Sequence, residues 1–289
     1  MLYRNARVEN AENTVDLRVQ DGLFAQIAPS LQPLPGEACE DLGGRLVLPP
    51  LIESHVHLDT CLTAGDPVWN LSGTLFEGIE CWSKRKDKLN REDVRQRVQQ
   101  AVRMYAAHGV QFIRTHVDVT DPKLTAMETI LSLREELRDV MDIQVVAFPQ
   151  EGILSYPNGK QLLTDAVRLG ADCVGAIPHY EFTREYSVES LNFAMELAAK
   201  ENRLVDVHCD EIDDEASRGL ETVAARALEL LGQGRPGDAH PEGEDQQGVE
   251  TDVNDGAGGD PHHAVEGAAL KAQLVAYLDF ESALLPSFH

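Results

Sequence analysis

Residues 49–60 read PPLIESHVHLDT, a short aliphatic segment that carries two histidines two positions apart. The aliphatic run predicts a buried strand, and residues two apart on a strand face the same side, so His55 and His57 point the same way. Two neighbouring imidazoles can each offer one nitrogen to a divalent ion at about 2.0–2.1 Å. The alternative is that the two histidines share a strand face without binding a metal. Asp59 directly after the pair, and His208 on a later predicted strand, favour the metal.

Composition excludes several classes of partner. The chain has 289 residues, 43% of them hydrophobic, and a formal net charge of -24. This charge argues against nucleic acid and anionic membranes and favours a small ligand. We find no transmembrane-length apolar run and no signal-peptide core at the N-terminus, so we expect a cytoplasmic protein. The cysteines are scattered without a Cys-x-x-Cys pair, which excludes the zinc signature of the small nucleobase deaminases and a disulfide framework: Cys39, Cys61, Cys81, Cys173 and Cys209.

Three regions differ in their patterning. Residues 1–48 predict a small β element, because alternating apolar residues flank the turn signal Asp21-Gly22. Residues 49–231 alternate short apolar strands with amphipathic helices. Residues 232–289 form an acidic, glycine-rich tail.

The alternation in the middle region predicts a parallel sheet covered by helices. After the strand around His55, we expect strands at 112–119, 143–148, 173–178 and 204–209. The expected helices run from Asn90 to Gly109, from Pro122 through Leu137, up to Gly170, from a cap at Ser187, and over 215–231. Strands this short suit a partial (β/α)8 TIM-type barrel with about five of its eight units, whose chemistry lies at the carboxyl ends of the strands.

Polar side chains occur at or just beyond the end of each predicted strand. Five consecutive strands that each deliver such groups to one rim indicate a shared site. The residues are, in chain order, His55 and His57, His116 and Asp118, Gln150 and Glu151, His179 and Glu181, and His208, Asp210 and Glu211.

Several motifs are more specific than His-x-His: HVHLDT, GTLFEGIECW, RTHVDV, VVAFPQEGILSYPNG, GAIPHYEFTREY and VDVHCDEIDDE, which together span residues 55–215. In these motifs, and over about residues 1–228, the chain resembles the bacterial cytosine deaminases of the amidohydrolase superfamily. That resemblance implies conversion of cytosine and water to uracil and ammonia. It also implies one catalytic iron or zinc ion held by His55, His57 and His208. Further implied roles are substrate contacts from Gln150 and the Leu75 backbone, and a proton shuttle at Glu211.

The chemistry of these side chains agrees with the implied roles. A bound divalent metal lowers the pKa of its water to about 7 and so supplies a nucleophile at neutral pH. A carboxylic acid such as Glu211 can protonate the ring nitrogen and assist the departure of ammonia. The amide of Gln150 offers both a donor and an acceptor, as does the edge of cytosine.

The remaining polar residues leave their roles open. His116 and Asp118 fit hydrogen bonding in the core or behind the metal ligands better than direct ligation. His179 fits either the mouth of the site or the core, and His108 fits a helix C-terminus, where a cation is favoured. Four aspartates could each orient a metal-binding histidine through its second ring nitrogen: Asp59, Asp210, Asp213 and Asp214.

The tail does not continue the repeating pattern. Its 58 residues contain nine glycines and 11 acidic against 2 basic residues, so we expect disorder, with a helix only within 264–285. Three further strand-helix units of about 30 residues each would not fit into this length. The resembled family also uses a sixth-strand histidine and an eighth-strand aspartate, which have no counterpart here. We therefore expect an out-of-frame or truncated tail that is unrelated to the fold.

Three functional interpretations follow. The first is the cytosine deaminase, and the second is an amidohydrolase acting on an aminotriazine or another cyclic amidine. The third is a remnant that binds metal without catalysis, which we expect for the chain as it stands in preference to measurable turnover. The expected partner is a small pyrimidine, and the sequence leaves open a homo-oligomer and the choice between iron and zinc.

Overall fold

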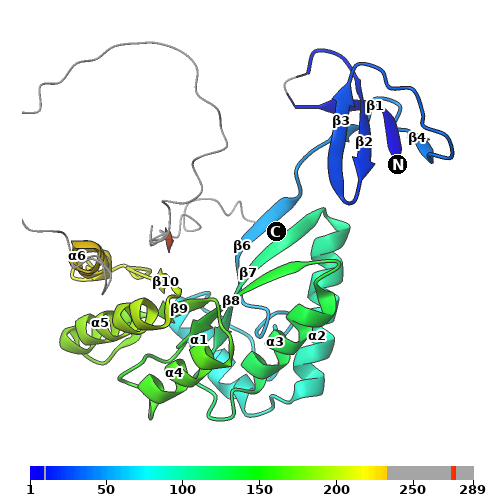
Figure 1. Cartoon of the computed structure of the whole chain (residues 1–289). Helices are drawn as coiled ribbons and strands as arrows, with labels where there is room; N and C mark the ends of the chain where they lie inside the picture. Colours follow the sequence, from blue (N-terminus) through cyan, green and yellow to red (C-terminus); the bar gives the residue numbers. More distant parts are fainter. Residues whose placement is uncertain (10, 233–274, 278–289) are drawn as a thin grey trace, which may run out of the picture. The chain divides into compact units, whose positions relative to one another are not determined.

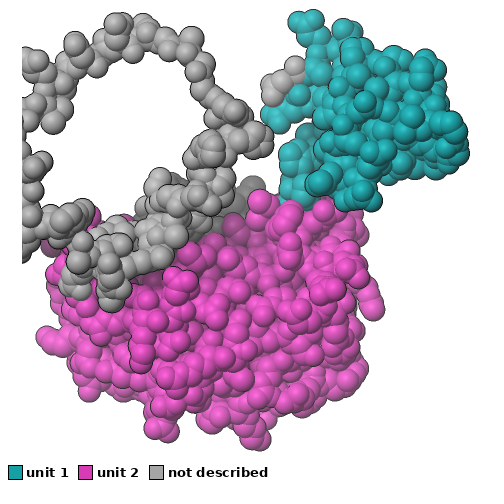
Figure 2. Space-filling model, viewed as in Figure 1, with its two compact units in different colours: residues 1–51 teal, residues 52–289 magenta. Residues whose placement is uncertain are grey.

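The computed structural model describes residues 1–9, 11–232 and 275–277. The chain divides into two compact units, residues 1–51 and 52–289, which Figure 2 shows in different colours. The division falls three residues beyond the expected boundary after residue 48. No helix in the described part of the chain is both long and apolar enough to cross a bilayer.

The first unit is a small β-sheet. Its strand order is β3-β2-β1-β4, and β5 pairs with the far end of β1. The predicted hairpin is confirmed, because β2 and β3 pair antiparallel around Asp21 and Gly22, both of which have positive φ. The sequence did not indicate the other three strands. The elements are β1 (Leu2–Val8), β2 (Val15–Gln20), β3 (Leu23–Ala28), β4 (Cys39–Asp41) and β5 (Leu46–Val47).

The second unit contains a parallel sheet that forms part of a barrel (Figure 1). Parallel ladders join β7 to β8, β8 to β9 and β9 to β10, and β6 completes the order. The α/β class and the partial barrel with five units are therefore as the sequence predicted. The strands are β6 (Leu51–Val56), β7 (Val110–Asp118), β8 (Asp142–Phe148), β9 (Cys173–Ala176) and β10 (Leu204–His208).

Helices connect successive strands and bury their apolar stripes against the sheet. The core is one continuous cluster of aliphatic side chains, such as Val98 of α2, Ile130 of α3, Val145 of β8 and Leu191 of α5. Neighbouring helices along the chain also lie side by side, as α2 and α3 do (Figure 1). The helices are α2 (Arg91–Ala107), α3 (Thr125–Leu137), α4 (Gly159–Leu169), α5 (Arg184–Glu201) and α6 (Gly219–Gly232).

One helix was missed from the sequence. Helix α1 (Leu75–Lys86) lies between β6 and α2, and Thr74 caps it by accepting a hydrogen bond from the Glu77 backbone N–H. The pair Thr74 and Glu77 has the spacing of a capping box, which would have indicated this start. Ile79 of α1 packs against Phe148 at the end of β8, so the helix lies near the carboxyl ends of the strands.

Three helix starts differ from those predicted. Helix α3 begins at Thr125, three residues after Pro122. Helix α5 begins three residues before Ser187, because Thr183 accepts from the Tyr186 N–H and is the true cap. The hydroxyl of Ser187 instead donates to the Pro178 carbonyl. Helix α6 begins at Gly219 rather than residue 215, because the Asp210 carboxylate accepts from the N–H groups of its first turn.

Most of the tail lies outside the described residues, and so does the expected disorder there. The exception is β11 (Val275–Tyr277), which pairs parallel with β10. The expectation of a helix within 264–285 is wrong for these three residues, which form a strand at the edge of the sheet.

A 3-10 turn replaces the end of the fourth predicted strand. Strand β9 stops at Ala176, and Pro178–Tyr180 form the turn η1. The Tyr180 N–H bonds back to the Ile177 carbonyl, which closes the turn. This turn directs His179 away from the sheet ladder.

Candidate metal centre

Four imidazoles meet at the carboxyl ends of the barrel strands. His55 and His57 come from the end of β6, His116 from β7 and His208 from the last position of β10. The ring centroids of His55 lie 5.4, 4.3 and 4.7 Å from those of His57, His116 and His208. The Nε2 atoms of His55 and His208 are 3.1 Å apart. The parallel sheet therefore brings together residues 153 positions apart in the chain.

Burial favours the neutral form of His57 and His208. Desolvation, reinforced by the neighbouring imidazoles, lowers the pKa of His57 and of His208 well below the ordinary histidine value. A neutral imidazole has a lone pair available for a metal, whereas an imidazolium does not. Phe148 covers one side of the cluster, with its ring centroid 4.2 Å from that of His208. The surroundings therefore favour the protonation state that a metal ligand needs.

The donor atoms fit a divalent ion. Two groups have ligand atoms within 4.8 Å of one another: His55, His57 and His116, and His116, Asp206 and His208. Of the three predicted ligands, His55 and His57 belong to the first group and His208 to the second. His116 belongs to both. Among the described residues, Nδ1 of His116 and Nδ1 of His208 are buried without a hydrogen-bond partner.

Asp206 is the acidic residue that the sequence reasoning missed. Its Oδ1 lies 3.0 Å from Nε2 of His116, and its Oδ2 accepts from Arg114 Nη1 at 2.9 Å. Burial opposes ionisation of Asp206, but the His116 hydrogen bond and the Arg114 charge hold its pKa below the ordinary value. The signal was present in the sequence, because Asp206 precedes His208 by two residues and so shares its strand face.

The aspartates that were expected to orient histidines have other partners. Asp59 accepts from the Asp118 backbone N–H, and burial raises its pKa to about 7. Asp210 caps α6, and Asp214 accepts from the Ala216 N–H in a local turn. For these three the expectation is wrong. For Asp213 it stays a prediction.

A cavity of about 670 Å³ opens over the imidazoles. Gln150 and Glu211 line it, and so do Leu75 at the start of α1 and His55, His57 and His208. The predicted substrate-binding and proton-transfer residues thus share one cavity with the predicted metal ligands. It is large enough for a small heterocycle.

Asp118 is a structural centre of the pocket, in keeping with its expected place behind the ligands. Its side chain is only 2% exposed, and Oδ2 accepts from Trp82 Nε1 at 2.8 Å and pairs with Lys86 Nζ at 3.1 Å. Its Oδ1 accepts from the Gln150 backbone N–H at 3.3 Å. Lys86 also reaches Glu151 at 2.5 Å. Asp118 therefore connects α1 to the segment that carries Gln150.

The two other histidines differ in their surroundings. The side chain of His179 is 1% exposed, and its Nε2 lies 3.7 Å from Oε2 of Glu211. Burial lowers the pKa of His179, although Asp210 opposes the shift. His179 therefore lies behind the predicted proton shuttle. His108 is the C-cap of α2, with Nδ1 at 2.7 Å from the Met104 carbonyl, as expected for a structural role.

Comparisons with known proteins agree with this geometry. The chain is 28% identical over 246 residues to N-isopropylammelide isopropyl amidohydrolase of Pseudomonas sp. (strain ADP), covering 83% of this chain and 60% of that protein. It is 27% identical to pterin deaminase of Rhizobium rhizogenes, covering 74% and 48%. Among solved structures, 5-methylcytosine deaminase from Klebsiella pneumoniae with 5-fluorocytosine superposes with a TM-score of 0.76 at 51% identity. That match covers 81% of this chain and 57% of the other.

The chain spans 60% or less of the length of each of these relatives. The model of the family described as "Amidohydrolase family" matches residues 38–255, which is most of the chain and extends past α6. The matched range includes the four histidines of the cluster, Asp206 and the residues that line the cavity. The chain belongs to the amidohydrolase family.

Proposed function

We propose that the site is that of a metal-dependent hydrolytic deaminase, which converts cytosine and water to uracil and ammonia. One observation carries the proposal: three of the four imidazoles, those of His55, His57 and His208, line a single cavity together with Gln150 and Glu211. A site for cyclic amidines needs these three functions within reach of one ring, namely metal ligands, a donor-acceptor amide and a proton carrier.

The chain's own residues divide the work. The ligands we propose are His55, His57 and His208, and a bound iron or zinc ion would supply a nucleophilic water at neutral pH. The Gln150 side chain and the Leu75 backbone bind the ring edge and orient it. Glu211 delivers a proton to the ring nitrogen as the C–O bond to the water oxygen forms, and then a proton to the exocyclic amine, so that the C–N bond breaks and ammonia leaves neutral.

The choice of a pyrimidine is supported by the 51% identity to a protein described as 5-methylcytosine deaminase. A second substrate class, the aminotriazines, is favoured by a different observation. The chain is 28% identical to the Pseudomonas isopropylammelide hydrolase and 31% identical to its solved Burkholderia multivorans counterpart. Both ring types carry a cyclic amidine, so both fit the same chemistry.

Metal binding, ring binding and turnover are all part of the proposal, and one experiment can measure them together. The test measures iron and zinc content and ammonia release together, on purified full-length chain, with cytosine and with ammelide. Ammonia release from cytosine, with one metal ion per chain, supports the assignment to cytosine. Faster release from ammelide than from cytosine supports an aminotriazine as the substrate instead.

Glu211→Gln provides the matched variant. It should keep the metal content and ring binding of the parent while losing ammonia release, because the amide cannot carry the proton. A monodisperse, metal-loaded parent that binds rings but releases no ammonia would assign this chain the non-catalytic role. A parent that holds no metal would contradict the proposal itself.

A further inference from the structure

We infer that the loop between β6 and α1, residues 60–74, is the wall of the pocket that selects the ring, and that buried Arg85 positions this wall through Asp66. The inference rests on the proposed function and identifies the part of the chain that discriminates one ring from another. It adds two kinds of residue to the site: positioning residues in an ion-pair network and a selecting residue, Trp69.

The loop forms a large part of the cavity wall. Leu62, Val68 and Trp69 line the pocket together with polar residues of the same loop. All three are considerably exposed, with Trp69 at 64%. The loop consists of turns and bends rather than helix or strand. Its position therefore depends on anchors outside itself.

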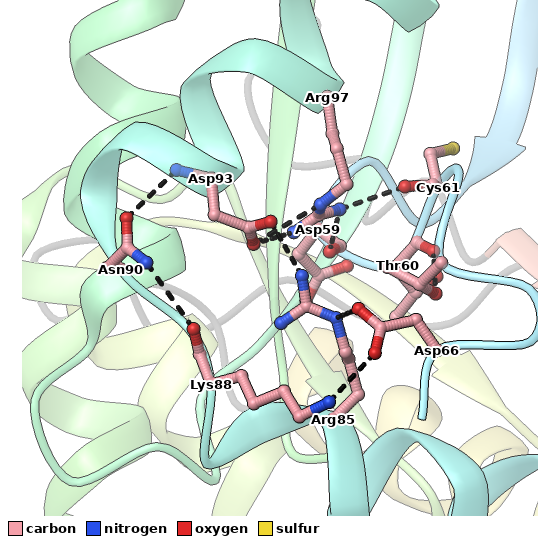
Figure 3. Close-up of polar contacts among 10 residues, drawn as sticks. Asp59, Thr60, Cys61, Asp66, Arg85, Lys88, Asn90, Asp93 and Arg97 are labelled. Atoms are coloured by element: carbon pink, nitrogen blue, oxygen red, sulfur yellow. Dashed lines mark hydrogen bonds and ion pairs between the residues drawn. The ribbon is translucent and has the colours of Figure 1, made fainter. Parts of the chain in front are cut away.

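Arg97 of α2 holds the start of the loop. Its Nη1 donates to the Asp59 carbonyl at 2.6 Å and to the Cys61 carbonyl at 2.9 Å (Figure 3). On its other side, Arg97 Nη2 pairs with Asp93 Oδ2 at 2.9 Å. The carboxylate of Asp93 thus orients Arg97 toward the loop backbone.

Arg85 of α1 holds the middle of the loop. It is 5% exposed, and its Nη2 lies 2.6 Å from Asp93 Oδ1. Its Nε lies 3.1 Å from Asp66 Oδ2, and Lys88 Nζ lies 2.9 Å from the other oxygen of Asp66 (Figure 3). A buried guanidinium is costly to desolvate unless it is paired, so Arg85 favours the loop position that brings Asp66 to it.

A glycine allows the loop to pack tightly. Gly65, next to Asp66, has φ +82°, and a Cβ added there would lie 2.6 Å from Cε2 of Trp69. The Trp69 indole therefore lies directly against the Gly65 backbone. This contact links the position of the indole to the ion pair one residue away. A partly exposed indole in a cavity wall offers a flat apolar surface on which a planar heterocycle can stack.

The first test uses hydrogen exchange on the ligand-free full-length chain. Asp66→Ala should speed exchange of the 60–74 amides about tenfold while β10 and α5 stay unchanged, since the loop loses its pair with Arg85. Asp66→Glu should restore slow exchange because it keeps the charge. Glu80→Ala is the control, because it removes an exposed ion pair with Lys84 within α1, the helix that carries Arg85, and leaves the Arg85–Asp66 pair in place. Equal exchange in Asp66→Ala and the parent would overturn the positioning role.

The second test measures binding of cytosine and ammelide to the zinc-loaded chain. Trp69→Ala should weaken binding of the better-bound ring by about two- to tenfold and narrow the preference between the two rings, with zinc affinity unchanged, because the stacking contact is lost. An unchanged preference would overturn the selecting role. A parent that binds neither ring contradicts the proposed function, while the exchange experiment judges the Arg85 network independently.

Discussion

The floor and the wall of the pocket are held in place by different interactions. The floor is the imidazole cluster, in which burial lowers the pKa of His57 and His208. It stands on β6, β7 and β10, whose backbone pairing sets the positions of its side chains. The wall is the loop of residues 60–74, held by charged side chains of α1 and α2. Its central contact, Asp66, has a side chain that is 54% exposed.

This difference separates chemistry from selection. Sheet register positions the floor rigidly, and altering it would disturb the core. The exposed carboxylate of the wall, Asp66, can be changed with little effect on the fold, because its pair with Lys88 is exposed on both sides and Arg85 keeps Asp93 as a partner. The predictions below distinguish the two regions, beginning with the floor, where the expected effects are largest.

Loss of a proposed ligand should have the largest effect. His208→Ala should weaken zinc binding by more than about 100-fold, since even partners behind a ligand are worth about 10- to 100-fold. Competition with a chelator measures the affinity. His108→Ala, which alters the cap of α2, is the control and should bind zinc like the parent. Equal zinc affinities in the two variants would show that His208 is not a metal ligand.

Asp206 should contribute less than a ligand. Asp206→Asn should weaken zinc binding by about 10- to 100-fold, because the neutral amide holds His116 less firmly and takes a charge away from the metal. Asp172→Asn is the control, since Asp172 pairs with Arg134 just before β9, at the amino end of that strand, whereas the imidazoles lie at the carboxyl ends. A loss confined to stability, with affinity intact, would make Asp206 purely structural.

The metal-free protein should respond to pH in two opposed ways. The lowered pKa values of His57 and His208 mean that the unfolded chain takes up protons first as the pH falls below about 6.5, so stability is lost there at up to about 1.4 kcal/mol per pH unit for each histidine. Asp59 acts oppositely: its pKa, raised from 3.8 to about 7, stabilises below 3.8, and that contribution is lost as the pH rises to about 7.

Asp59→Asn should therefore steepen the rise in stability between pH 5 and 6.5, because the opposing contribution disappears. Urea unfolding at several pH values measures both slopes. A mutant slope equal to or shallower than that of the parent would show that Asp59 is ionised in the folded chain.

The junction of wall and helix should give a smaller effect. Thr74→Ala removes the cap of α1 and should cost about 1 kcal/mol, together with weaker ring binding, because Leu75 begins this helix. Thr183→Ala removes the equivalent cap of α5. It should cost a similar amount in urea unfolding while ring binding stays at the parent value. Similar ring affinities in the two variants would show that the cap of α1 does not contribute to ring binding.

Salt should produce the smallest change, and only in the wall. The Lys88 and Asp66 side chains are both about half exposed, so raising sodium chloride to about 0.5 M should screen their pair and modestly speed exchange of the loop. The Arg114–Asp206 pair is buried, and exchange of β10 should not change. Faster exchange in both regions would mean that the floor also depends on exposed charge.

Much of the barrel could be read from the sequence because its strands and helices carry strong local signals. Apolar runs marked all five strands to within a few residues. The expectation that the first of them is buried is wrong, because Leu51 and Ile52 of β6 are 54% and 70% exposed. Helix α2 began at Asn90 as expected, since the cap and the apolar spacing agree. Helix α5 did not begin at Ser187, because a serine near a helix start can serve as the cap or bond elsewhere, and only the fold decides which.

The candidate site was read less completely. The sequence indicated that polar groups from five strands share one rim, and the described structure places Gln150, Glu211, His55, His57 and His208 around one cavity. The sequence also placed His116 at this rim, but it did not indicate that Asp206 is its partner. The anchors of the loop, Arg85 and Arg97, gave no signal, because charged residues on amphipathic helices usually face solvent.

By itself, the sequence determined the order of strands and helices, the face on which each strand side chain projects, and the kinds of group available for chemistry. These follow from local backbone preference and the period of the apolar residues. Only the tertiary structure decided which groups meet, such as His55 with His208 or Arg85 with Asp66. Those distances depend on strand pairing and helix packing, which join residues far apart in the chain and leave no local pattern.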